Sequence, residues 1–145
     1  MPLLNYTTKV PVIKTLAEIQ AILVKAGATA VLNEYQDGYI IALSFKVVVN
    51  GQEIAFKLPS EWQPIMSILE RQRVPRSLQT QEQALRVSWR IVKDWVEAQM
   101  AIIETKMATV DQVFLPYAVM RGGKTLYQKI VDDGLLLTGG ENETN

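Results

Sequence analysis

The sequence contains no cysteine and no histidine. The lack of cysteine excludes disulfide bonds, thiolate nucleophiles and zinc or iron–sulfur sites that use cysteine ligands. The lack of histidine removes the most common general base and the most common transition-metal ligand. No close acidic pair or cluster stands out to replace them. We therefore expect a protein without enzymatic activity, without a metal site and without a cofactor.

Neither sign of charge is in excess, and long hydrophobic runs are missing. Fifteen basic and fifteen acidic residues cancel, so no overall field marks the chain as a nucleic-acid or membrane binder. Apolar runs such as Val47–Val49 are far shorter than the ~20 residues that a membrane span needs. The first residues also lack the basic and apolar stretches of a signal peptide. We expect a cytoplasmic protein with no membrane partner.

The length and composition are those of one folded domain. The 145 residues fall in the usual range for a single domain, and 48% hydrophobic with 21% charged residues is typical of globular proteins. No repeat or linker indicates a second domain. We expect one α+β domain over residues 1–137 and a disordered polar tail over residues 138–145.

Five Ser/Thr-x-x-Glu/Gln capping boxes indicate where helices begin, because each pair satisfies free backbone N–H groups of a first helical turn. They are Thr15/Glu18, Ser60/Gln63, Thr80/Gln83, Thr109/Gln112 and Thr125/Gln128. The helices expected from them span residues 15–26, 60–72, 80–107, 109–115 and 125–133. The C-terminal half should therefore be helical, with one long helix at residues 80–107.

Between residues 28 and 58 the apolar pattern has a period of two, which predicts β-strands. Tyr39, Ile41, Leu43, Phe45, Val47 and Val49 should share one buried face. Two turn signals, Asp37-Gly38 and Asn50-Gly51, divide the segment into three strands. We expect an antiparallel meander packed by the N-terminal helix, with residues 4–12 as a candidate fourth strand at an edge.

The two turns also predict a register. A type I′ turn at Asn50-Gly51 sets Phe45 opposite Phe56, Val47 opposite Ile54 and Leu43 opposite Leu58. The turn at Asp37-Gly38 sets Leu32 opposite Leu43.

The long helix expected at residues 80–107 has an apolar arc that exceeds half of its circumference. An ordinary surface helix buries a stripe only somewhat wider than about 100°. Trp89 and Trp95 lie on opposite sides of this arc. We expect the helix to be covered on two sides. We also expect a homo-oligomer, most simply a dimer that uses this helix or the second face of the sheet.

Basic residues concentrate between Arg71 and Lys93, a stretch that contains six basic residues and one acidic residue, Glu82. Arg86, Arg90 and Lys93 follow one another at i, i+4 and i+7 of the long helix, so they can act together on a phosphate. Arg76 belongs to the same basic stretch. The alternative is a solvated helix face on which Glu97 pairs with Lys93.

A second basic group surrounds Gly122-Gly123. The segment Arg121–Thr125 resembles the end of a P-loop, but residue 118 is alanine where that motif needs glycine, so the segment fails as the signature of a nucleotide hydrolase. Arg121 and Lys124 can still bind an anion at a helix start. The alternative is a turn capped by Thr125.

The aromatic residues Trp62, Trp89, Trp95 and Tyr117 have two interpretations. They fill the core, or one of them provides a stacking surface for a base beside the arginines.

Several segments resemble a group of small uncharacterised proteins encoded by bacteriophages, prophages and mobile elements. They are Arg90–Gln99, Val113–Tyr117, Gly123–Tyr127 and Tyr6-Thr7-Thr8. The resemblance implies a protein that serves such an element in the host cytoplasm. It brings no activity and no site residues.

These patterns lead us to expect an accessory protein that binds a phosphate-bearing ligand, such as a nucleotide signal sequestered in counter-defence. The expected ligand-binding residues are Arg76, Arg86, Trp89, Arg90, Lys93, Arg121 and Lys124. Single-stranded DNA binding in recombination or replication is an alternative, although balanced charge favours a smaller ligand. A protein-binding inhibitor of a host defence factor is another. The cations on the rigid helix should contribute more than those beside Gly122-Gly123.

Overall fold

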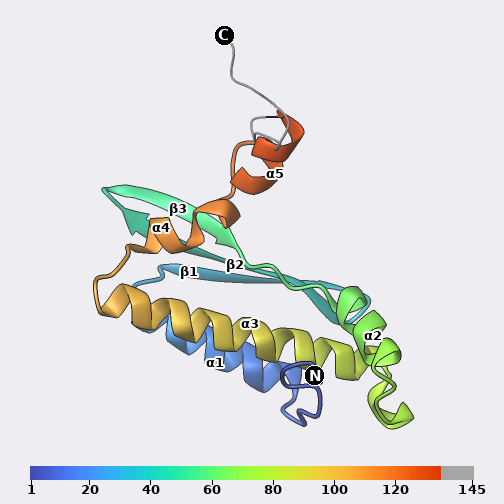
Figure 1. The fold of residues 1–145 in the computed structure, drawn as a ribbon. Coiled ribbons are helices and arrows are strands. Elements are labelled where there is room, and N and C mark those ends of the chain that lie inside the picture. Colours follow the sequence, from blue (N-terminus) through green and yellow to red (C-terminus); the bar gives the residue numbers. More distant parts are fainter. Residues whose placement is uncertain (135–145) are drawn as a thin grey trace.

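An N-terminal helix, a three-stranded antiparallel sheet and a helical C-terminal half follow one another in a computed structural model that describes residues 1–134 (Figure 1). The α-helices are α1 (Val12–Lys25), α2 (Trp62–Arg71), α3 (Gln81–Glu104), α4 (Val110–Phe114) and α5 (Leu126–Asp132). The strands are β1 (Ala30–Gln36), β2 (Tyr39–Val49) and β3 (Gln52–Lys57), and the short 3-10 helices are η1 (Arg76–Leu78) and η2 (Leu115–Tyr117). The α+β fold expected from the sequence is confirmed. The tail expected at residues 138–145 lies outside the described residues.

The sheet forms one layer and the helices α1 and α3 form a second layer against one of its faces (Figure 1). The core between the layers contains side chains from α1, from the sheet and from α3. Ile19 and Leu23 come from α1, Phe45 and Phe56 from the sheet, and Trp89 from α3. Helix α2 packs beside the first half of α3. The buried face of the sheet therefore lies entirely on the helical side.

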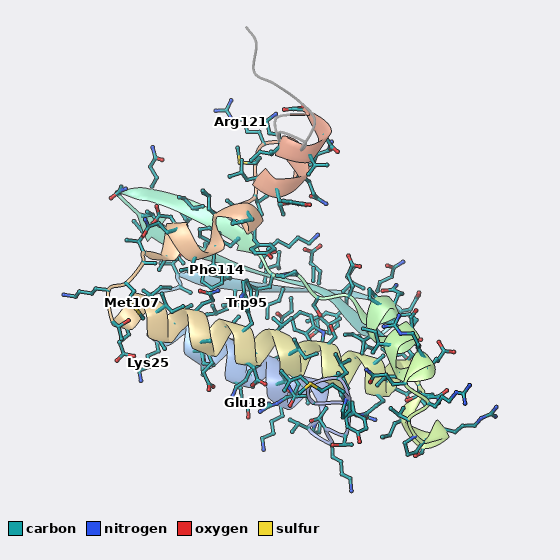
Figure 2. The ribbon with its side chains drawn as sticks, in the orientation of Figure 1. Glu18, Lys25, Trp95, Met107, Phe114 and Arg121 are labelled. Carbon is teal, nitrogen blue, oxygen red and sulfur yellow. The ribbon has the colours of Figure 1, made fainter. Side chains whose placement is uncertain are left out.

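An aromatic cluster lies at one end of the core, beside the second half of α3 and away from α2. Phe114 of α4 is fully buried, and its ring centroid lies 5.4 Å from that of Phe45 and 5.5 Å from that of Trp95. Trp95 also contacts Tyr117 of η2 edge to face. Helix α4 and η2 thus pack against both the sheet and α3 (Figure 2).

The wide apolar arc of α3 is covered within one chain. Helix α1, helix α2, the sheet, and the segment of α4 and η2 each contact part of it. A second copy of the chain is not needed to bury this helix. The homo-oligomer expected from the arc stays a prediction, and the long helix is no longer the surface that supports it.

The register of β2 with β3 is the one that the sequence predicts. Phe45 lies opposite Phe56 and Val47 opposite Ile54. The backbone N–H of Leu58 donates to the carbonyl oxygen of Leu43 at 2.9 Å, which continues the pairing beyond β3. Asn50 and Gly51 have φ values of 52° and 80°, as a type I′ turn requires.

The register expected between β1 and β2 is wrong by one residue. Leu32 lies opposite Ser44, because the pairing steps from Glu34↔Ala42 to Tyr35↔Ile40 and leaves Ile41 as a β-bulge. The extra residue inverts the side-chain alternation. Ile40 is buried and Ile41 is exposed, whereas farther along the strand Leu43 and Phe45 are buried and Lys46 and Val48 are exposed. The expectation that Tyr39 and Ile41 share the buried face of Leu43 is therefore also wrong.

Three of the five predicted helix starts are confirmed. The Thr80 and Thr125 hydroxyl oxygens accept from the backbone N–H of the third following residue, at 3.1 Å and 3.3 Å. Thr109 and Gln112 form a reciprocal capping box. Helix α3 is somewhat shorter than expected and ends at Glu104.

The other two starts are wrong. Helix α1 begins at Val12, directly after Pro11, so Thr15 is a fully buried residue inside the helix. Helix α2 begins at Trp62 with Glu61 as N-cap, and the Ser60 hydroxyl instead contacts that of Ser88 at 2.9 Å. In both cases a tertiary hydrogen bond engages the hydroxyl that the capping box would have used.

The candidate fourth strand at residues 4–12 is also wrong. Residues 4–7 form turns, and the sheet within residues 1–134 consists of β1, β2 and β3. The buried side chain of Gln83 explains this, because its amide nitrogen donates to the carbonyl oxygens of Tyr6 at 2.9 Å and Thr8 at 3.0 Å. These bonds hold the N-terminal segment against α3 and away from the sheet.

Candidate ligand-binding site

The three cations predicted on α3 all have partners within the chain. The Arg86 Nε–H donates to Gln83 Oε1 at 2.9 Å. Arg90 forms an ion pair with Glu18 of α1 and donates to the Thr15 hydroxyl. The Lys93 ammonium lies 2.7 Å from the Glu97 carboxylate, which is the i,i+4 pair that the sequence offered as an alternative.

The polar arc of α3 is partly covered, because α1 and the N-terminal segment contact it. The Arg90 and Lys93 side chains are only 18% and 15% exposed. Farther along the same arc, Asp94 accepts a hydrogen bond from the Asn5 side chain at 2.9 Å. A phosphate on Arg90 or Lys93 would have to displace the carboxylate that already pairs with it.

The remaining predicted cations lie elsewhere. Arg76 is exposed on η1. Arg121 lies beyond the sheet from α3, near α5 (Figure 2). Lys124 follows the turn after Arg121 and forms an ion pair with Asp132, whose hydrogen bond and charge raise the pKa of the Lys124 ammonium. In that turn the N–H of Gly123 donates to the carbonyl oxygen of Met120 at 3.0 Å, so this N–H is not available to an anion.

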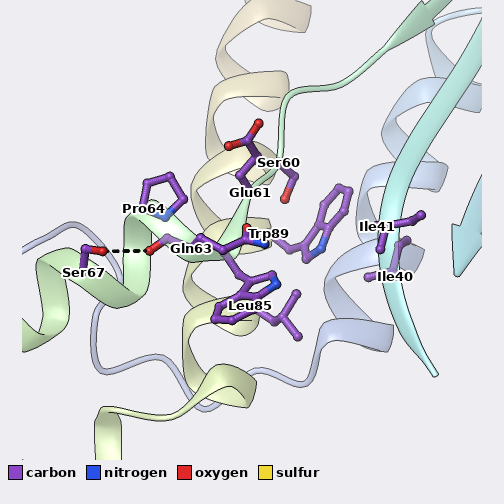
Figure 3. Close-up of a pocket in the computed structure, with 10 residues that line it drawn as sticks. Ile40, Ile41, Ser60, Glu61, Gln63, Pro64, Ser67, Leu85 and Trp89 are labelled. Carbon is purple, nitrogen blue, oxygen red and sulfur yellow. Dashed lines mark hydrogen bonds between the residues drawn. The ribbon is translucent and has the colours of Figure 1, made fainter. Parts of the chain in front are cut away.

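A cleft of about 630 Å³ opens between the start of β2, the connector before α2, and the first half of α3 (Figure 3). Its size is typical of small-molecule sites. Its apolar walls are Ile40, Ile41, Trp62, Pro64, Leu85 and Trp89, and its polar groups are Ser60, Glu61, Gln63 and Ser67. Of the residues predicted to bind a ligand, Trp89 is the one that lines this cleft.

Trp89 carries an unsatisfied hydrogen-bond donor. The side chain is 1% exposed, and its indole Nε1–H is buried without an acceptor. The indole lies between the Gln63 side chain and the β2 residues Ile40 and Ile41 (Figure 3). A buried donor without a partner costs about 1–3 kcal/mol. An acceptor brought by a ligand would recover this energy if the side chains around the indole moved to admit it.

The polar groups of the cleft divide into two kinds. The hydroxyls are engaged: Ser60 contacts Ser88, and Ser67 donates to the Gln63 carbonyl oxygen at 3.2 Å. The side chains of Glu61 and Gln63 are exposed and form no hydrogen bond with other described residues. A ligand therefore meets an exposed carboxylate and an exposed amide, whereas the indole N–H of Trp89 is buried in the cleft wall.

A second hollow of about 450 Å³ continues from the cleft. It shares Ile41, Ser60 and Glu61 with the cleft, and adds Lys57, Tyr117 and Tyr127 among its walls. Lys57 is exposed and forms no ion pair among residues 1–134. The bulge places Ile41 at the junction of the two hollows, as bulges often re-aim side chains beside binding sites.

The sequence revealed only part of this arrangement. Trp62 and Trp89 belonged to the predicted aromatic set, but Ile41, Lys57, Glu61 and Gln63 were missed. The segment Ser60–Gln63 has the pattern of a capping box, which predicts that its side chains begin a helix. A bulge at Ile41 leaves no signal in the sequence.

Comparisons with protein-family models, with curated proteins and with solved structures gave no match. Within residues 1–134, no helix combines the length and the apolar character needed to cross a membrane. The same part of the chain holds no group of three or more acidic residues arranged for a metal ion.

Proposed function

We propose that this protein is a non-enzymatic binding protein for a nucleotide, whose base occupies the cleft of Figure 3. The observation that carries the proposal is the buried, unpartnered Nε1–H of Trp89 in the wall of a cleft that Trp62 also lines. A nucleobase offers ring acceptors to an N–H donor and a flat face to an indole. Its remaining edge matches the carboxylate of Glu61 and the amide of Gln63, which accept and donate respectively.

The phosphate of this ligand would lie in the adjoining hollow, near Lys57. An ammonium binds phosphate as a point charge and needs no paired geometry. This assignment keeps the phosphate-bearing ligand expected from the sequence and moves its cation from α3 to the end of β3. Arg90 then stabilises the contact between α1 and α3, and Lys93 forms an ion pair with Glu97 on the surface of α3.

The cellular context is part of the same proposal. A cytoplasmic accessory protein of a phage or mobile element, acting in counter-defence, would use such a cleft to sequester a nucleotide signal. The support for this context is the sequence resemblance alone.

The first test measures binding of nucleosides and of mono-, di- and cyclic nucleotides by tryptophan fluorescence and thermal shift. Trp89→Phe removes the N–H and keeps an aromatic ring, so affinity should fall by about 3- to 10-fold, as expected for one neutral hydrogen bond. Trp95→Phe is the matched control, since it makes the same change on the same helix against Phe114 and Tyr117. Lys57→Ala should lower the affinity for nucleotides and leave the affinity for nucleosides unchanged.

Three results would contradict the proposal. The first is no response to any nucleoside or nucleotide. The second is a fluorescent oligonucleotide that binds with a steep salt dependence while nucleotides do not, which would favour single-stranded DNA. The third is a loss of nucleotide affinity in Arg86→Ala or Lys93→Ala with unchanged melting temperature, which would return the site to α3.

A further inference from the structure

The outer edge of β1 is unpaired among the described residues. The sheet has the order β1-β2-β3, so β1 and β3 are its edges. The edge of β3 is partly occupied, because Ala118 bridges Phe56 and the N–H of Val119 donates to the Ala55 carbonyl oxygen at 2.8 Å. The pairing of β1 within residues 1–134 is with β2 alone (Figure 1).

The ladder shows which backbone groups of β1 point outward. In antiparallel sheets the N–H and C=O of one residue point to the same neighbour, and successive residues alternate. The carbonyl oxygen of Leu43 accepts from the N–H of Leu58, so the backbone groups of Leu43 point toward β3. Those of the next residue, Ser44, therefore point toward β1, where they meet the backbone groups of its partner Leu32. Val31 and Asn33 therefore direct their backbone groups away from the sheet.

Strand β1 carries few of the features that usually protect an edge, and the bulge in its pairing lies on β2. It contains no proline, no glycine and no lysine, and Glu34 is its one charge. Leu32 is 59% exposed on the face of the sheet opposite the helices, and Tyr35 is exposed as well. Natural edge strands with this composition are templates for pairing with another strand.

We propose that β1 pairs with β1 of a second copy of this chain, antiparallel about a two-fold axis at Leu32. This register sets Val31 of each copy opposite Asn33 of the other, so the outward backbone groups on both sides meet as hydrogen-bonded pairs. The two Leu32 side chains become direct cross-strand neighbours and bury each other. Glu34 of each copy lies opposite Ala30 of the other, so no like charges oppose each other.

A second copy is the occupant that the strand itself specifies. The same surface on both partners satisfies a two-fold contact, and one register satisfies the outward hydrogen-bonding groups, the exposed leucine and the carboxylates together. The contact joins two sheets edge to edge and leaves the cleft of Figure 3 open. It is therefore independent of the proposed nucleotide binding.

The test is the mass in solution by light scattering, measured from about 1 to about 100 μM because a short edge gives a weak interface. The parent should approach twice the chain mass of 16.3 kDa at the upper end. Leu32→Lys places two lysines opposite each other at the axis and should give a monomer. Val48→Lys is the matched control: Val48 is an exposed apolar residue on the same face of the sheet, but on the central strand, so the dimer should persist.

Hydrogen exchange gives a readout that needs no substitution. The amides of Val31 and Asn33 should exchange more slowly at high than at low protein concentration. A parent protein that stays monomeric at 100 μM would overturn the proposal. A dimer that survives Leu32→Lys and dissociates in Val48→Lys would also overturn it, because the interface would then be the face of the sheet.

Discussion

The substitution Arg90→Ala tests whether Arg90 stabilises the fold or binds a ligand. Its guanidinium joins α3 to α1 through the Glu18 carboxylate and the hydroxyl of the fully buried Thr15. The Arg90 and Glu18 side chains are 18% and 34% exposed, so the pair lies between a surface ion pair and a buried one. Arg90→Ala should therefore destabilise the fold, in contrast to the effect expected of a cation on an open helix face.

The magnitude follows from these two limits. Exposed ion pairs contribute about 0.2–1 kcal/mol, whereas removing one partner of a buried pair costs about 3–5 kcal/mol. The intermediate exposure and the additional bond to Thr15 place the loss at about 2 kcal/mol in the free energy of unfolding. For a domain of this size that corresponds to a fall in melting temperature of roughly 4–8 °C.

The assay is urea unfolding of the parent, Arg90→Ala, Glu18→Ala and the double variant. The double-mutant cycle isolates the interaction between the two side chains, which should be favourable by about 1 kcal/mol or more. Arg76→Ala is the control, since Arg76 is exposed on η1 and its loss should change stability by less than about 0.5 kcal/mol. An Arg90→Ala protein as stable as the Arg76→Ala control would refute the reasoning, and so would additive effects in the cycle.

Two further predictions concern the C-terminal half. Phe114→Ala should lower the free energy of unfolding by about 3–5 kcal/mol in the same assay, because it opens a cavity among Phe45, Phe56 and Trp95, whereas Leu115→Ala, at an exposed neighbour, should cost far less. Equal losses would show that α4 does not anchor the core. The pKa of Lys124 should lie above its ordinary value of 10.5 because of the hydrogen bond and charge of Asp132, and NMR titration of Asp132→Asn should show it lowered. The stability that this pair adds is then fully present below the unfolded pKa and is lost as pH rises through the raised folded pKa, so parent and variant should converge at high pH.

The sequence determined the features that depend on neighbouring residues. The hairpin of β2 and β3 follows from Asn50-Gly51, because few other residue pairs adopt two successive positive φ values, and its register then follows from the turn. Helix starts at Thr80, Thr109 and Thr125 are equally local, since the capping hydroxyl and the N–H that it accepts from are three residues apart. The α+β class results from these local signals and from the change of apolar period along the chain.

The tertiary structure decided the role of a side chain wherever a residue distant in sequence formed a hydrogen bond with it. The Thr15 and Ser60 hydroxyls resemble helix caps, yet Arg90 and Ser88 engage them from α3. The polar arc of α3 has the same appearance whether water or α1 and the N-terminal segment cover it. The β-bulge at Ile41 is a property of the pairing between β1 and β2, and it changes which side chains of β2 are exposed. The candidate cleft depends on this bulge and on the docking of α2 against α3, and neither is encoded by residues that are close in sequence.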